Sequence, residues 1–282
     1  MRANLSLLLA AAIIPALTPP ALAVSIVVSN ASFEIPSLPQ DQFTHVGGPN
    51  AFTPEQSFAI PGWGGTLGYA PNGAIIVSAG VRNATNSVDG NQTLYITVHE
   101  EMPSPLATIW QDVGDVSPNT TYTLKVAAGG PLNGVADGAQ AMIALTLNTW
   151  EGPALASTNF QSIGYMHGLS DYSCTCTTGP STTGRLVISL TMFGIPVPSN
   201  LELNFDNVRL EAFTPPSLTI APVDDGISLA WPSSATNYWL EATRQLSLNP
   251  TWLPVTNTGG LGTNQLVIST PQEASTFYRL RQ

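Results

Sequence analysis

The chain has 282 residues and a formal net charge of -10, with only 8 Lys and Arg residues against 18 Asp and Glu residues. So few cations exclude a protein that binds nucleic acid through its phosphates, because that mode of binding needs clustered Lys and Arg. Hydrophobic residues make up 43% of the chain and charged residues 9%, which excludes disorder driven by charge. We therefore expect a folded, acidic, loop-rich protein with one large or two modest domains.

The first segment predicts an export signal. Arg2 provides a short positive region, residues 5–14 are apolar, and residues 21–23 read Ala-Leu-Ala, the small-x-small pattern that signal peptidase accepts. A membrane anchor is the alternative, but the apolar run stops at Pro15, well short of the roughly 20 residues that a bilayer requires. We predict a signal peptide at residues 1–23 and a secreted, extracellular product without a membrane span.

Two cysteines lie two residues apart, as Cys174 and Cys176. In an extended strand their Cα atoms would be about 6.6 Å apart, at the upper limit for a disulfide, so a bridge would need a kinked loop. The sequence leaves a disulfide and two free thiols both open. A zinc site that adds His167 is disfavoured because it lacks a fourth ligand.

Alternating apolar and polar residues recur along the first two thirds of the chain. In residues 121–126, Tyr122, Leu124 and Val126 fall on one face, which predicts a half-buried antiparallel strand. Residues 141–147 and 186–192 alternate in the same way, and Gly, Pro and Asn clusters separate such runs. These patterns predict an all-β first domain with the strand spacing of a sandwich.

A domain boundary is predicted near Thr214, because Pro215 and Pro216 follow it and proline cannot continue a central strand. Short alternating runs come after this boundary, and a module of this size with several short strands suits an immunoglobulin-like or fibronectin-like sandwich. We therefore predict a first domain at residues 24–213 and a small β module at residues 214–282.

Six short motifs occur in an order found in a known family. They are Asn30-Ala31-Ser32-Phe33-Glu34, Pro61-Gly62-Trp63, Asp89-Gly90, Trp110-Gln111-Asp112-Val113, Pro118-Asn119-Thr120-Thr121-Tyr122-Thr123-Leu124 and Asn204-Phe205-Asp206-Asn207-Val208-Arg209-Leu210. Through them, residues 25–212 resemble the galactose-binding-like β-jelly-roll of carbohydrate-binding modules and of exosortase-sorted secreted bacterial proteins. The second domain is similar to short fibronectin-like modules that end secreted proteins of some environmental bacteria. The resemblance implies a β-sandwich jelly roll followed by a small immunoglobulin- or fibronectin-like β-sandwich.

The same resemblance implies a structural calcium ion held by Glu34 and Asp206. The residues around Asp206 also have a pattern of their own, since Leu203 and Phe205 share one parity while Val208 has the other. A change of phase within one strand predicts a bulge at residues 206–207, which redirects the side chains there. Carboxylate and carbonyl oxygens suit calcium. The alternative is that both acids are solvated turn residues.

A sugar-binding surface is predicted from exposed aromatic residues beside polar groups, because sugar rings stack on flat apolar faces. Alternation in residues 94–99 places Tyr95 and His99 outward, and in the next strand it places Trp110 and Asp112 outward. If the two strands form a hairpin, these four residues make one patch. The alternative is that a loop or the second domain covers the aromatic rings, and Trp63 is assigned to packing.

The sequence therefore predicts a secreted, non-catalytic binding protein that contacts a polysaccharide or another glycan. An inert extracellular matrix or surface protein is the first alternative, and a secreted glycan-active hydrolase is the second. Catalysis is disfavoured because the sequence has no nucleophile elbow, no metalloprotease helix and no phosphate-binding loop. Glycosidase carboxylates stay open, since they share no local motif.

Overall fold

The computed structural model describes residues 23–44, 60–67, 77–83, 87–98, 107–130, 140–161, 168–193, 201–223, 226–232, 235, 238–255, 265–269 and 276–282. The chain divides into two compact units, of which one is Ala23–Pro215 and the other contains Pro216–Gln282. Every regular element in the described ranges is a β-strand, which confirms the predicted all-β class. No helix in these ranges has the length and apolar character needed to cross a membrane.

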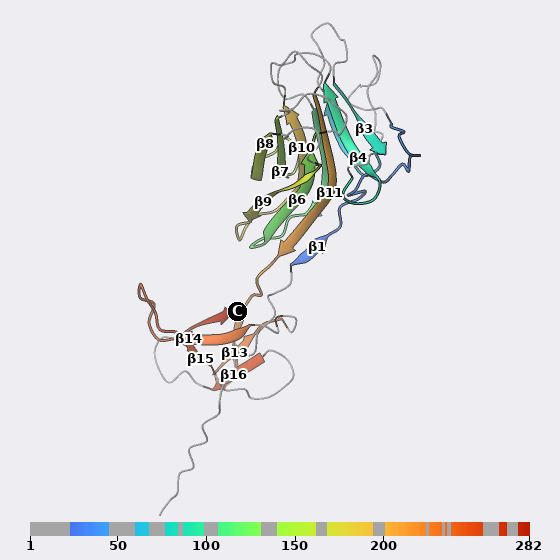
Figure 1. Ribbon diagram of the computed structural model, residues 1–282. Helices are drawn as coiled ribbons and strands as arrows, with labels where there is room; N and C mark the ends of the chain where they lie inside the picture. Colours follow the sequence, from blue (N-terminus) through green and yellow to red (C-terminus); the bar gives the residue numbers. More distant parts are fainter. Residues whose placement is uncertain are drawn as a thin grey trace, which may run out of the picture. The chain divides into compact units, whose positions relative to one another are not determined.

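The first unit contains two antiparallel sheets. The six-stranded sheet has the order β3-β4-β11-β6-β9, with β1 paired to β11, and Figure 1 shows β11, β6 and β9 side by side. Its strands are β1 (Val24–Ile26), β3 (Val77–Asn83), β4 (Gln92–Val98), β6 (Thr121–Gly129), β9 (Ser170–Thr177) and β11 (Leu201–Phe213). The five-stranded sheet has the order β2-β5-β10-β7-β8. Its strands are β2 (Gly64–Leu67), β5 (Ala107–Asp115), β7 (Gln140–Leu147), β8 (Ala154–Gln161) and β10 (Arg185–Phe193).

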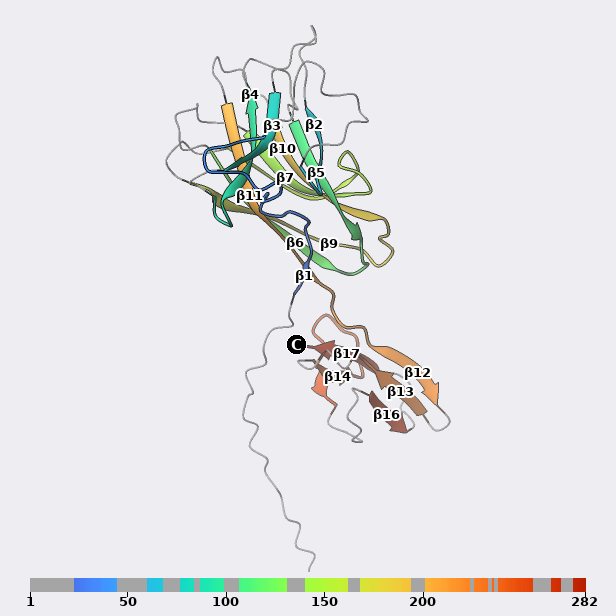
Figure 2. The ribbon, with the colours of Figure 1, turned by 90° about the vertical axis from the view of Figure 1, so that its right-hand side faces the viewer.

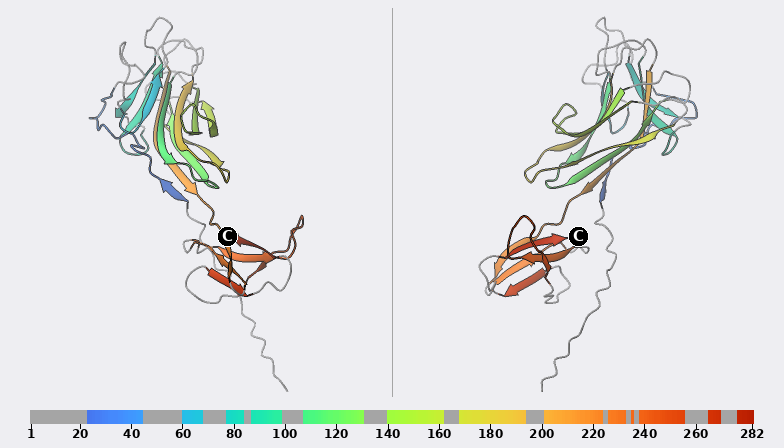
Figure 3. Two further views of the ribbon diagram at one scale, coloured as in Figure 1. Left: turned by 180° about the vertical axis from the view of Figure 1, so that it is seen from behind. Right: turned by 60° about the vertical axis from the view of Figure 1, so that its left-hand side comes forward.

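The two sheets of the first unit lie face to face (Figure 3), and the side chains between them form one hydrophobic core. The predicted alternation is confirmed, since Tyr122, Leu124 and Val126 of β6 are all buried there. The five-stranded sheet contributes its own buried set, which includes Ile143 and Ile188. Because side chains alternate across a strand, the residues between these lie on the two outer faces of the sandwich.

The bulge predicted in β11 is present. The register of β11 against β6 shifts between Asp206 and Arg209, and Asn207 has a positive φ of 48°. Phe205 before the bulge and Val208 after it are both buried in the core. One extra residue therefore lets both halves of this long strand face inward despite their opposite parity.

The second unit contains two three-stranded antiparallel sheets in its described residues. One has the order β12-β13-β16 (Figure 2) and the other β15-β14-β17. The strands are β12 (Thr219–Val223), β13 (Gly226–Ala230), β14 (Trp239–Thr243), β15 (Leu253–Pro254), β16 (Gln265–Ser269) and β17 (Phe277–Arg281). Leu229 and Leu240 are the buried centre of a small core. The fibronectin-like classification of this unit stays a prediction.

Candidate functional site

A buried polar cluster lies on the outer face of the six-stranded sheet, away from the hydrophobic core. Tyr95 in β4 and Glu202 and Asn204 in β11 alternate with the inward-facing side chains of the same strands. Their exposed fractions are 2%, 4% and 1%, respectively. Burying a carboxylate and an amide outside the core costs free energy unless they are paired, so this cluster is a candidate functional site.

Arg82 in β3 provides the ionic partner of Glu202. Its two terminal nitrogens donate to the two carboxylate oxygens at 2.6 and 3.1 Å, a bidentate arrangement. The guanidinium carbon also lies 4.7 Å from the centroid of the Tyr95 ring. The positive charge therefore lies against both the carboxylate and the phenol ring, and it fixes the position of the carboxylate on the sheet.

The Tyr95 hydroxyl is held by a segment that crosses the edge of the sheet. It donates a hydrogen bond to the carbonyl oxygen of Thr44 at 2.8 Å. A Cβ atom on Gly80 would collide with the same carbonyl, so a glycine is required beneath this segment. Burial raises the pKa of Tyr95 to about 12, with Arg82 opposing the shift and Glu202 adding to it. At neutral pH the phenol therefore keeps its proton.

Two buried oxygens beside Tyr95 have no hydrogen-bond partner among the described residues. They are Oδ1 of Asn204 and Oγ1 of Thr93. Asn204 stands directly opposite Tyr95 on one side and Gly129 on the other. A buried acceptor without a donor costs about 1 to 3 kcal/mol, which a ligand that carries a donor group would recover.

The predicted sugar patch is wrong, because its aromatic residues lie in different sheets. Tyr95 belongs to β4, which pairs with β3 and β11, whereas Trp110 and Asp112 belong to β5, which pairs with β2 and β10. The two strands therefore do not form the hairpin on which the patch depended. The chain crosses from one sheet to the other between β4 and β5, which local alternation cannot reveal. His99 lies outside the described residues.

Trp110 lies on the outer face of the five-stranded sheet, opposite Gly64 of β2 in the strand register. A Cβ atom on Gly64 would come within 2.5 Å of the indole ring, so the ring covers this glycine. The ring nitrogen of Trp110 is buried and has no hydrogen-bond partner in the described part of the chain. Trp63 packs in the core, as assigned from the sequence, with 4% exposure.

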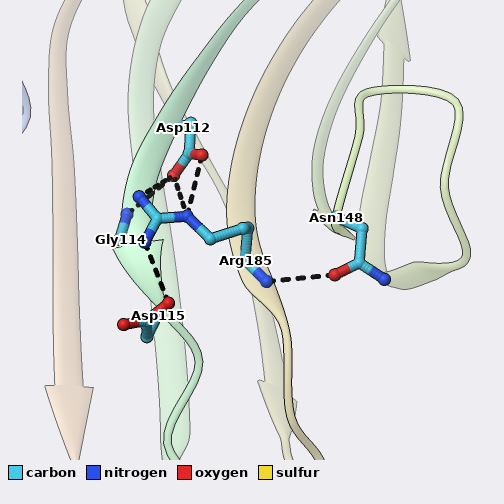
Figure 4. Close-up of polar contacts among 5 residues, drawn as sticks. All are labelled: Asp112, Gly114, Asp115, Asn148 and Arg185. Carbon is cyan, nitrogen blue, oxygen red and sulfur yellow. Dashed lines mark hydrogen bonds and ion pairs between the residues drawn. The ribbon is translucent and has the colours of Figure 1, made fainter.

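Asp112 is part of an exposed ion-pair network rather than a ligand-facing patch (Figure 4). The Nε atom of Arg185 donates to both carboxylate oxygens of Asp112 at 2.9 and 3.1 Å, and its Nη1 atom reaches Asp115 at 2.8 Å. These hydrogen bonds from Arg185 lower the pKa of Asp112. The Asp112 side chain is therefore held by Arg185, near the end of β5 and at the start of β10.

Glu34 and Asp206, the predicted calcium ligands, hold the same short turn. Oε1 of Glu34 accepts hydrogen bonds from the backbone N–H groups of residues 91 and 92, both at 2.7 Å. Oδ2 of Asp206 accepts from the N–H groups of residues 88 and 89, at 2.7 and 3.0 Å. Burial raises the pKa of Asp206 to about 6, although these N–H groups oppose the shift. The two acids converge on residues 88–92 from β11 and from the N-terminal segment.

Calcium binding by these two acids stays a prediction. Calcium takes six to eight oxygen ligands. Within the described ranges, no group of three or more His, Cys, Asp or Glu side chains is placed to hold a metal ion. In the described residues both carboxylates accept hydrogen bonds from backbone N–H groups.

Cys174 and Cys176 are free thiols on the inward side of β9. Burial raises the pKa of Cys174 to about 11, and the neighbouring Cys176 adds to the shift. A thiol with so high a pKa is a poor nucleophile at neutral pH. The structure therefore favours the free-thiol alternative, with the pair acting as packing residues. His167 lies outside the described residues.

Of the buried polar cluster, the sequence analysis named Tyr95 as a ligand-binding candidate but missed Arg82, Glu202 and Asn204. Arg82 and Glu202 are 120 positions apart, so no local spacing connects them. Local alternation gives no signal either, because Glu202 and Asn204 alternate with Leu203 and Phe205, which is the pattern of a strand with one solvent-facing polar side. Only the structure shows that this polar side is buried.

The chain was compared with known families and structures. The family model HpiC1-like, described as HpiC1 cyclase, matches residues 24–211. The Stig cyclase Fisc from Fischerella sp. TAU, solved in complex with (3Z)-3-(1-methyl-2-pyrrolidinylidene)-3H-indole, is 24% identical with a TM-score of 0.51, and the match covers 68% of this chain and 99% of that chain. An apo cyclase from Fischerella sp. is 23% identical with a TM-score of 0.50, and the match covers 68% and 97% of the two chains. No curated protein matches.

A third structure, a cyclase from Fischerella sp. TAU in complex with 4-(1H-Indol-3-yl)butan-2-one, is 24% identical with a TM-score of 0.50 and covers 68% of this chain and 98% of that chain. These likenesses establish the jelly-roll-like fold of the first unit. The family match corrects two expectations, since a non-catalytic binding protein and the absence of an enzyme are both contradicted by a model that describes a cyclase. The sequence analysis failed here because it weighed catalysis only against a nucleophile elbow, a metalloprotease helix, a phosphate-binding loop and glycosidase carboxylates, none of which identifies this family.

Proposed function

The chain belongs to the HpiC1-like family, and from that membership we propose that its jelly roll is a cyclase domain whose active site is the cluster of Arg82, Tyr95, Glu202 and Asn204. The observation that carries the proposal is the buried ion pair of Glu202 with Arg82 on a sheet face that has no part in the hydrophobic core. A charged pair in such a position is costly to maintain for stability alone.

Glu202 is the group that we propose handles charge during ring closure. A cyclisation forms a bond within one substrate molecule, so any proton that one atom gains must be balanced by a proton that another atom loses. A fixed carboxylate lowers the energy of a cationic intermediate, and it can accept the proton that the closed ring releases. Arg82 holds the carboxylate in place through its bidentate contact and is therefore a positioning residue.

Tyr95 and Asn204 supply the shape and polarity of the proposed site. The Tyr95 ring is a buried aromatic wall of the cluster that packs against Arg82, and its hydroxyl donates to the carbonyl oxygen of Thr44. Asn204 Oδ1 is a buried acceptor that a substrate N–H group would satisfy. We propose a substrate that combines a planar aromatic ring with an N–H donor. The 4-(1H-Indol-3-yl)butan-2-one bound in one of the Fischerella cyclase structures is of that kind.

The first test measures the binding of 4-(1H-Indol-3-yl)butan-2-one to residues 24–282 by isothermal titration calorimetry. We expect saturable binding that weakens about tenfold in Asn204→Ala, because the acceptor of the N–H group is lost. The matched control is Asn159→Ala, an exposed amide in β8 of the other sheet. Equal affinity of Asn204→Ala and wild type for the compound would show that the compound does not bind at this cluster.

The second test measures turnover of a panel of alkenyl-substituted indoles, since ring closure gives a product of unchanged mass and altered retention. We expect Glu202→Gln to lower the rate by about 100-fold or more, because the charge that stabilises the transition state is removed. The control is Asp171→Asn, which removes an exposed carboxylate that pairs with Arg209 on the same sheet. A folded Glu202→Gln variant with the wild-type rate would refute this assignment, and a wild type that turns over no panel member would refute the indole class.

The remaining sequence-based predictions are kept as proposals. Export of the chain after cleavage near residue 23 is tested by expression with and without residues 1–23 and mass analysis of the secreted product. The fibronectin-like nature of the second unit is tested by an experimental structure of residues 214–282. Contact with a glycan is tested by affinity gel electrophoresis of residues 24–282 with polygalacturonate.

A further inference from the structure

The outer face of one sheet in the second unit carries an ordered array of aromatic and cationic side chains. In the register of β14 with β17, Trp239 stands opposite Arg281, and Glu241 stands opposite Arg279. The residues between them, Leu240 in β14 and Leu280 in β17, pack in the small core. Trp239, Glu241, Arg279 and Arg281, together with Trp252, are called the aromatic–cation face below.

Glu241 organises this face from beneath. It is only 3% exposed, and its carboxylate accepts hydrogen bonds from Arg279 at 2.8 Å and from Arg281 and the Trp239 indole at 3.3 Å. Burial acts to raise the pKa of Glu241, but these three hydrogen bonds outweigh it and lower the pKa. The carboxylate therefore stays charged and holds two guanidinium groups and one indole in fixed positions.

The cations of this face exceed its acids. Arg279 and Arg281 share the single carboxylate of Glu241, and their side chains remain 41% and 57% exposed. In the ion pairs that the structure describes in the first unit, each arginine faces at least one acid of its own, and Arg185 faces two. The aromatic–cation face therefore has a net positive charge, although the whole chain has a net charge of -10.

Aromatic rings flank the two arginines. The Arg279 guanidinium carbon lies 4.2 Å from the centroid of the Trp252 ring. Trp239 is 38% exposed and stands beside Arg281 across the strand pair. A half-exposed indole offers a flat apolar surface to the C–H face of a sugar ring, and a guanidinium fork matches the geometry of a carboxylate.

We propose that the aromatic–cation face binds uronic acid residues of an acidic polysaccharide, with Arg281 paired to the sugar carboxylate and Trp239 stacked on the ring. Charge and shape complementarity select this occupant, since an exposed guanidinium stands beside an exposed indole, and a uronic acid combines a carboxylate with a sugar ring. Glu241 and Arg279 are positioning residues, because they orient Arg281 and Trp252 through direct contacts. The inference is independent of the cyclase proposal, which concerns the first unit.

The test is retention of residues 24–282 in affinity gel electrophoresis with polygalacturonate. Fully methyl-esterified polygalacturonate is the matched ligand control, because it has the same backbone without the charge. We expect retardation by polygalacturonate alone and a loss of about tenfold or more in affinity for Arg281→Gln and for Trp239→Ala. The control variant is Arg244→Gln, which removes an equal charge from the same unit outside the face and should bind as wild type does.

Several results would overturn the proposal. Equal retention by the methyl ester would exclude carboxylate recognition, and equal retention by dextran sulfate would show a general attraction to polyanions. Unchanged binding in a folded Arg281→Gln variant would exclude this face. If Arg281→Gln fails to fold, Arg281→Lys keeps the charge but not the fork, and it should bind more weakly than wild type. Self-association that light scattering detects in wild type and not in these variants would assign the face to a second copy instead.

Discussion

Trp110 covers Gly64 on the neighbouring strand so closely that a Cβ atom at residue 64 would lie within 2.5 Å of the indole. The two residues are directly paired in the register of β2 with β5. The glycine is therefore a packing requirement of the ring, and the ring is a fixed part of the outer face of the five-stranded sheet. This relationship gives a first prediction about the stability of the first unit.

Gly64→Ala should destabilise the first unit by about 1 to 3 kcal/mol, because the added methyl group displaces the Trp110 ring. Urea unfolding followed by tryptophan fluorescence measures the change. The control is Gly179→Ala, where the nearest atom to an added Cβ is a threonine hydroxyl at 3.5 Å. In a Trp110→Ala background the Gly64→Ala cost should disappear, and a cost that persists would assign the effect to the backbone of β2.

Arg82→Gln should destabilise the first unit by about 2 to 4 kcal/mol, because it leaves the buried carboxylate of Glu202 without its ionic partner. The side chain of Glu202 is 5% exposed and that of Arg82 is 25% exposed, so solvent compensates only part of the loss. Arg185→Gln is the comparison, since its pairs are exposed and should contribute little. Equal chemical denaturation midpoints for the two variants would contradict this reading of the buried pair.

Tyr95 should make stability depend on alkaline pH. Its pKa is raised to about 12 by burial, against about 10 in an unfolded chain. Between these values the folded state keeps a proton that the unfolded state has lost, so the stabilisation is fully present below about pH 10 and is lost as the pH rises toward 12. Tyr95→Phe should flatten the decline in denaturation midpoint between about pH 10 and 12. Tyr238→Phe in the second unit is the control, and an equal flattening there would contradict the assignment.

Asp206→Ala should lower the melting temperature even in the presence of a chelator, because it leaves the backbone N–H groups of residues 88 and 89 without acceptors. The calcium prediction adds a second effect. If calcium binds Asp206 and Glu34, calcium chloride should raise the melting temperature of wild type and not that of Asp206→Ala. Identical melting of wild type with calcium and with chelator would refute the calcium site and leave the hydrogen-bonding role intact.

The sequence by itself determined the class of the fold and the face that each strand residue takes. Alternation of apolar residues identified the inward side chains of β6, and the change of parity between Phe205 and Val208 located the bulge. These features are local, because the side-chain direction in a strand repeats every two residues whatever the strand pairs with. The cyclase family was not identified in this way, because alternation fixes the face of a side chain and not its chemistry, and the family model matches the first unit as a whole, over residues 24–211.

Only the tertiary structure decided which strands are neighbours. It separated Tyr95 from Trp110 by placing β4 and β5 in different sheets, and it joined Arg82 to Glu202 across 120 positions. The physical reason is that alternation fixes the face of a side chain but not its neighbours on that face. Those neighbours depend on strand order, which is set by crossings between the two sheets and by the burial of both inner faces in one core.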